Sequence, residues 1–408
     1  MILASVIIFT TVLAGLRFDE GGAGGTGQVG MFITLPCLLL FFAINFDHAL
    51  RTLTAPAIVP FLVLFSFLLS GYVLGNDFYN RSDRIFTPTS LLGILGIFYF
   101  GYLIGPRSLT RPMYGWVVSL AVTIQSLLVV FVPPQIVTNK FERSSGIFGD
   151  PNIVMLHIIP FYFLAFAYLR LQNALKFAVI PVGLLVVLAA LASGSRSGIF
   201  ALIFSSVLAA GYMVVLRSGK FGTWRLFQIV LLIGVMAGIF GAIFSDRIVE
   251  YTTFLEYRTQ ERIDQKGLFG DRLEYIAPML RLSMQDVLHP LGFGYDIYFR
   301  DSWSYTLPHN TFADVLIIAG PFAFFIYLAA YGYTFLKLSA RSTGIATSPQ
   351  AQQISFSLLL AIISQFLLLN TLSVLTMKAP WLLLGMCLGI LREAHGTTLI
   401  RRRILRSN

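Results

Sequence analysis

The stretch PHNTFADVLIIAG, residues 308–320, passes from a polar loop directly into an apolar run. Thr311 is followed three residues later by Asp314, a capping pattern that predicts a helix from about Phe312. His309 then lies just before a helix N-terminus, at the edge of a membrane. The positive end of a helix dipole disfavours imidazolium, so we expect a neutral His309 that accepts a proton. The alternative is an interfacial histidine that only hydrogen-bonds a loop carbonyl.

The composition of the rest of the chain is that of a polytopic membrane protein. The 408 residues are 56% apolar and 12% charged, with a mean hydropathy of +0.78, whereas soluble proteins are about 25% charged. The two cysteines, Cys37 and Cys387, lie in apolar runs, which argues against a disulfide framework. The net charge of +10 does not indicate nucleic-acid binding, because the charged residues lie in the loops between the apolar runs.

Apolar runs of nearly or fully membrane-spanning length recur throughout the chain and predict an all-α fold with about twelve transmembrane helices. The last two runs are alternatively one broken pair around Asn370 and Lys378. The runs cover about 1–16, 29–46, 56–75, 90–106, 113–132, 153–169, 175–193, 197–216, 226–244, 311–336, 354–370 and 375–391.

Positive charges in the short loops predict the orientation. Alternate loops on one side carry 15 of the 29 basic residues but only Asp47 and Glu393 of the 19 acidic ones. The positive-inside rule assigns that side to the cytoplasm. We therefore expect both termini there, with 392–408 as a basic cytoplasmic tail.

Residues 245–310 form the one long extramembrane segment, and the segment is too patterned for disorder. Leu273, Ile276 and Leu280 recur at helical spacing. We expect short interfacial helices in a large outer, periplasmic loop between the ninth and tenth helices. A single integral domain, 1–408, is the simplest organisation.

Two arginines stand at predicted helix starts on the outer side. Arg196, in the turn Ala192–Gly198, and Arg272, after Asp271, lie where the helix dipole disfavours a cation. A bound phosphate resolves that conflict, and two guanidinium groups suit a diphosphate. The alternatives are snorkelling of Arg196 to the interface and a surface ion pair of Arg272.

Other candidates are less distinctive. Trp303 belongs to an aromatic cluster that either stacks on sugar rings or forms an interfacial belt. Arg281 is a further possible substrate contact. No carboxylate pair suits glycosidase chemistry, and no Asp-x-Asp offers a metal site. We expect histidine and arginine chemistry with no metal and no cofactor.

Taken together, these motifs resemble those of the O-antigen ligase and polysaccharide polymerase superfamily. The resemblance rests on four stretches in order: 148–152 (FGDPN), 195–198 (SRSG), Arg272 followed by 289–294 (HPLGFG), and His309-Asn310 followed by Gly320. The motif-bearing part is about 145–325. Ser197 and Asp150 depart from the usual residues at their positions.

The resemblance implies a metal-independent, inverting membrane glycosyltransferase in the bacterial inner membrane, active on the periplasmic face. Its donor would be a glycan on undecaprenyl diphosphate, and its acceptor the lipid A core or a growing glycan. His309 would be the base, and Arg196 and Arg272 would bind the diphosphate. Asn310, Asn152, Arg281 and Trp303 would be substrate contacts.

Three functions remain open at this point. The single large outer loop favours an O-antigen ligase. Arg281 and Gly292, with ten residues between them, resemble a pattern of polymerases that join lipid-linked repeat units. A lipid-linked oligosaccharide flippase or transporter would place polar groups at mid-membrane, whereas here they gather at the outer edge.

Overall fold

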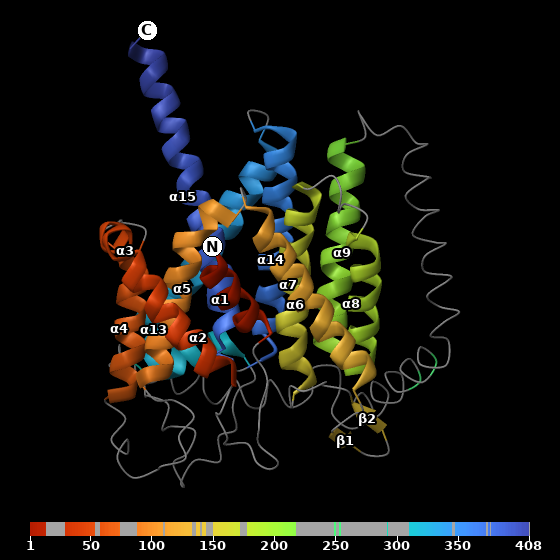
Figure 1. Cartoon of the computed structure of the whole chain (residues 1–408). Coiled ribbons are helices and arrows are strands. Elements are labelled where there is room, and N and C mark those ends of the chain that lie inside the picture. Colours follow the sequence, from red (N-terminus) through yellow and green to blue (C-terminus); the bar gives the residue numbers. More distant parts are fainter. Residues whose placement is uncertain are drawn as a thin grey trace. The chain divides into compact units, whose positions relative to one another are not determined.

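The fold was analysed in a computed structural model of the whole chain (Figure 1). Besides Val249, Thr253 and Gly292, the structure describes 1–13, 29–53, 58–73, 88–108, 111–132, 136–138, 141–143, 150–171, 178–217, 310–344, 347–372, 374–375 and 377–407.

The chain forms two compact units, each treated by itself below. Unit 1 draws on 1–111, 268–337 and 369–408, and unit 2 on 112–267 and 338–368. The single-domain organisation stays a prediction.

The described part of unit 1 is helical (Figure 1). Asn45 separates two of its helices, and the chain bends there by 87°. The Asn45 amide donates to the carbonyl of Phe41, at 2.8 Å, and the short helix that follows is amphipathic. The helices are α1 (Ile2–Val12), α2 (Val29–Ile44), α3 (Phe46–Leu53), α4 (Val59–Val73), α5 (Pro88–Ser108), the first part of α13 (Thr311–Thr343) and α15 (Lys378–Ser407).

The closest helix pair in unit 1 is α5 with α15. Gly101 and Gly105 of α5 face Gly385 and Gly389 of α15, and each lies against backbone atoms of the opposite helix. A Cβ on Gly101 would come within 2.6 Å of the Leu382 carbonyl oxygen. Small residues four apart let membrane helices approach this closely. The two helices run parallel, so residue positions along one can be matched to the other.

Aromatic side chains fill the core of unit 1. Phe98 of α5 packs on Phe61 of α4, with ring centroids 4.2 Å apart. Trp381 of α15 is buried and lies 5.0 Å from Phe65 and 5.2 Å from Tyr327 of α13. This core joins α4, α5, α15 and the part of α13 that follows Gly320.

Basic residues gather at one end of unit 1. Arg51, Arg107 and Arg392 all lie near enough to His48 of α3 for their charges to interact with its imidazole. Arg392 also lies 4.8 Å from the centre of the Tyr102 ring. These arginines belong to the loops predicted to face the cytoplasm, which accounts for their clustering at one end.

Unit 2 is also helical, with one small exception. Two three-residue strands, β1 (Ile136–Thr138) and β2 (Phe141–Arg143), pair antiparallel where a plain loop was expected. The helices are α6 (Pro112–Phe131), α7 (Pro151–Leu171), α8 (Val179–Ser193), α9 (Arg196–Arg217), the end of α13, and α14 (Pro349–Leu369). Stacked Tyr212 and Phe356 rings, 3.6 Å apart, join α9 to α14.

Each predicted apolar run except 226–244, which lies outside the described residues, contains a helix. Within the described ranges, five helices are long and apolar enough to span a membrane, or six if the bent pair α2–α3 counts as one. The part of the chain that the structure describes is therefore helical apart from β1 and β2, with helices that can cross a membrane, while the count of twelve spans and the large outer loop stay predictions. α14 ends at Leu369 and α15 begins at Lys378, and α14 is by itself long enough to span a membrane, so the alternative of one broken pair around Asn370 and Lys378 stays a prediction.

Candidate functional site

Asn310 caps the N-terminus of α13. Its Oδ1 accepts hydrogen bonds from the backbone N–H of Phe312, at 3.0 Å, and of Ala313, at 3.1 Å. Such a cap satisfies two of the backbone donors that a helix start leaves unpaired. The predicted helix start is thus correct to one residue, but the predicted Thr311–Asp314 cap is wrong, because the residue before Thr311 supplies the cap.

Thr311 makes a tertiary contact instead. Its buried hydroxyl donates to the carbonyl of Leu372, at 2.5 Å, and accepts the N–H of Val374, at 3.2 Å. The amide of Asn310 also reaches Oδ1 of Asn370, at 3.5 Å. The start of α13 is therefore fastened to the non-helical segment between α14 and α15, which we call the 370–377 connector.

Gly320 interrupts α13 two to three turns further on. Its φ of 83° and ψ of 176° are non-helical, and Pro321 follows it. Gly292, with φ 75°, lies directly on this break, since a Cβ there would come within 2.5 Å of the Gly320 backbone nitrogen. One glycine from the 289–294 motif thus touches the glycine of the His-Asn…Gly pattern. Only glycine fits both this backbone angle and this contact.

The start of α7 is held in unit 2 by the 148–152 motif. The Asp150 carboxylate accepts the N–H of Asn152, at 2.7 Å, beside Pro151 at the first helical position. Aspartate before such a proline is a favoured helix start. Asp150, a departure from the usual residue, therefore acts as a cap, and Asn152 is left in the first turn with its side chain free to reach α9.

The turn between α8 and α9 meets Asn152. Gly194 adopts the left-handed conformation, φ 57° and ψ 24°, and ends α8. The Ser195 hydroxyl accepts the N–H of Gly198, at 3.1 Å, and donates to Oδ1 of Asn152, at 2.8 Å. Ser195 is therefore both the cap of α9 and the link between two motifs 43 residues apart. The Ser197 hydroxyl lies 3.3 Å from that of Ser195.

Arg196 is the first residue of α9, as predicted, and is partly buried. The capped turn fixes its backbone, so the residue that carries this positive charge is anchored at the N-terminus of α9. Such a site is suited to an anion, and a phosphate in particular.

His309, Arg272, Arg281 and Trp303 lie outside the described residues, so their roles stay predictions. Of the seven candidate residues, Asn152 and Arg196 lie at one hydrogen-bonded junction of unit 2, and Asn310 lies at the connector of unit 1. The contacts of Thr311 and Gly292 were not predicted. The only feature of the sequence that hinted at the Gly292 contact was a glycine in each of the two motifs, Gly292 and Gly320.

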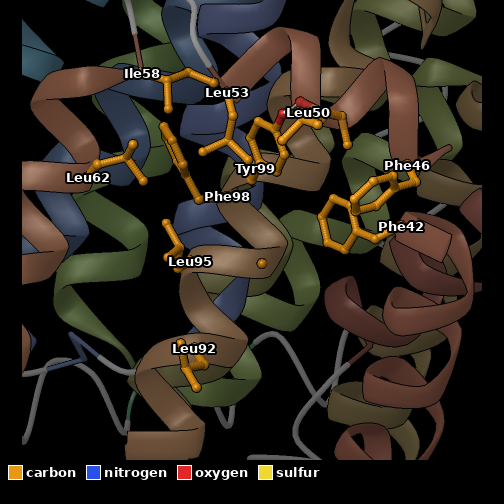
Figure 2. Close-up of a pocket in the computed structure, with 12 residues that line it drawn as sticks. Phe42, Phe46, Leu50, Leu53, Ile58, Leu62, Leu92, Leu95, Phe98 and Tyr99 are labelled. Carbon is orange, nitrogen blue, oxygen red and sulfur yellow. Dashed lines mark hydrogen bonds between the residues drawn. The ribbon is translucent and has the colours of Figure 1, made fainter.

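An apolar cavity of about 300 Å³ lies elsewhere in unit 1. Figure 2 shows its walls: Phe42 and Phe46 on one side, Leu62 opposite, and Leu92 and Tyr99 along α5. The lining is almost wholly hydrocarbon, so this cavity suits an acyl or prenyl chain and offers no group for catalysis.

Among the described residues, no three His, Cys, Asp or Glu side chains come together to hold a metal ion. Two of the five histidines and most acidic residues lie outside those ranges, so metal independence stays a prediction.

Comparison with known proteins gives one family. A sequence model described as O-antigen ligase matches residues 181–328, which include the Arg196 turn, Gly292 and the start of α13. No curated protein matches the chain. The match confirms the resemblance drawn from the motifs over the segment 181–328, which is similar to the O-antigen ligase family.

Proposed function

We propose that the protein transfers a glycan from an undecaprenyl-diphosphate carrier to an acceptor sugar at the outer face of the bacterial inner membrane, as an O-antigen ligase does. The observation that carries the proposal is the hydrogen-bonded junction of Asn152 and Ser195, which caps the N-terminus of α9 where Arg196 is the first helical residue. An anionic leaving group is what such a junction stabilises. The junction falls inside the family match at Ser195 and Arg196.

The proposed reaction uses the chain's own side chains. His309 takes the proton of the acceptor hydroxyl as its oxygen attacks the anomeric carbon. The bond from that carbon to the diphosphate breaks on the opposite face, so the configuration inverts. Arg196 and Arg272 take up the negative charge that develops on the departing undecaprenyl diphosphate. Asn310 caps the helix that follows the proposed base.

Holding two large substrates in line supplies much of the rate. Asn152, Arg281 and Trp303 are assigned to substrate contact, the first through its bond to Ser195. The topology that goes with this reaction has both termini and the tail 392–408 in the cytoplasm and the segment 245–310 outside. The arginines clustered near His48 support that orientation through the positive-inside rule.

A transfer assay on purified protein tests the proposal. Wild type, His309→Gln and Arg196→Ala would be given undecaprenyl-diphosphate glycan with lipid A core in EDTA. Loss of a general base lowers a rate by about 10²–10⁴-fold, so we expect transfer to fall that far in His309→Gln and to persist in EDTA. Full activity of His309→Gln would remove it as the base, and inhibition by EDTA would remove metal independence.

The same assay separates ligase from polymerase. A single product on the lipid A core is the result of a ligase. A ladder of lengths on the polyprenyl carrier, formed with repeat units as the acceptor, would replace the ligase assignment by a polymerase.

A further inference from the structure

Lys378, the first residue of α15, is a buried lysine for which the proposed reaction has no use. Only 7% of its surface is exposed. Across the described helices and their connectors, no acceptor and no acidic group pairs with its ammonium. Burying an unpaired charge costs free energy, and the start of a helix is the wrong end for a cation.

The position of Lys378 in unit 1 is opposite the arginine cluster. Its Cε lies 3.8 Å from the point a Cβ on Gly93 would occupy, near the start of α5. Arg392 lies 14 positions later in the same helix, about 21 Å away at 1.5 Å per residue. Because the arginines mark the predicted cytoplasmic end, Lys378 belongs to the outer end.

The connector ties Lys378 to the start of α13. Val374 donates its N–H to Thr311, and the N–H of Met377 returns to the carbonyl of Val374, at 2.9 Å. Trp381 Nε1 donates to the carbonyl of Leu375, at 2.9 Å, and so fixes the connector to α15. Lys378 follows Val374 by four residues, a span of at most about 14 Å. Through Val374 the connector thus links Lys378 to Thr311, the residue that follows Asn310.

We propose that Lys378 and the N-terminus of α15 form a second phosphate-binding site at the outer membrane edge. The group bound is a phosphate of the lipid-linked diphosphate, and this assignment rests on the proposed function. An anion there pairs the buried ammonium and meets the positive end of the helix dipole, which removes both costs at once. A phospholipid headgroup offers the same chemistry, so the test separates the two sources.

The test measures the affinity of farnesyl diphosphate, a short stand-in for the carrier, in nanodiscs of phosphatidylcholine. The variant is Lys378→Met, which keeps the length of the side chain and removes a buried charge. The control is Lys337→Met, since Lys337 is a cation of α13 that lies over Tyr333. A charge-assisted contact predicts an affinity about tenfold to a hundredfold lower in Lys378→Met. We expect no change in Lys337→Met, and farnesol should not bind at the site.

Two results overturn the inference: wild-type affinity for farnesyl diphosphate in Lys378→Met, or an equal loss in Lys337→Met. A second set of nanodiscs contains phosphatidylglycerol. Competition by this lipid in wild type but not in Lys378→Met would make the headgroup the source of the phosphate and overturn the carrier assignment.

Separate measurements of binding and of glycan transfer distinguish failure of this site from failure of the proposed function. Glycan transfer by wild type with unchanged binding in Lys378→Met would refute the site and keep the enzyme. Binding that depends on Lys378, without transfer to any acceptor, would keep the site and refute the enzyme.

Discussion

Replacing Thr311 by valine tests whether the connector is held by the start of α13. Valine has nearly the same shape as threonine but lacks its hydroxyl. The change deprives the Leu372 carbonyl of its donor and the Val374 N–H of its acceptor, in a place where Thr311 is 1% exposed. Each buried group left unpaired costs about 1–3 kcal/mol, so we expect the free energy of unfolding to fall by about 2–6 kcal/mol.

Thr334→Val is the matched control in the same helix. The Thr334 hydroxyl is fully buried but donates only to the carbonyl of Ala330, one turn back, at 2.7 Å. That carbonyl keeps its backbone hydrogen bond in the helix. Loss of the Thr334 hydroxyl should therefore lower the free energy of unfolding by less than about 1 kcal/mol. Unfolding by denaturant in micelles gives both values. An effect of Thr311→Val no larger than that of Thr334→Val would refute the reasoning, and hydrogen exchange at 370–377 should rise only in Thr311→Val.

Two further predictions concern the motif contacts. Gly292→Ala should destabilise the protein by about 2–4 kcal/mol, because the positive φ of Gly292 and its contact with α13 both exclude a Cβ. Gly332→Ala is the control and should not destabilise it, because open space surrounds Gly332. Thermal unfolding compares the two variants, and equal effects would contradict the contact of Gly292 with α13. Ser195→Ala should cost about 1–3 kcal/mol and raise the KM for the lipid-linked donor through the loss of the α9 cap beside Arg196. Ser197→Ala is its control, and steady-state kinetics showing equal KM values would count against the junction.

Local sequence rules predicted the helices well and their tertiary contacts poorly. The apolar runs located the helices, and the capping pattern placed the start of α13 within one residue. The cap itself was misassigned because Thr311 bonds to a carbonyl 61 residues away, and a rule that spans four residues contains no such partner. The bend at Asn45 and the hairpin at 136–143 depend on local geometry that hydropathy does not encode.

The candidate site was predicted in part because its motifs are short and contiguous. Arg196 was expected at a helix start and is found there. The bond between Asn152 and Ser195 required two helices to meet, and neither the spacing of the motifs nor the family resemblance predicted that contact. The contact of Gly292 with Gly320 likewise joins two motifs that are separate in the sequence.

The most direct test of the central claim is the stoichiometry of the reaction. Purified protein would be reconstituted with labelled undecaprenyl-diphosphate glycan and an acceptor sugar, and both products counted. The account predicts one undecaprenyl diphosphate released for each new glycosidic bond, with inverted anomeric configuration and loss of both products in Arg196→Ala. Movement of the intact donor across the membrane with no bond formed would contradict it.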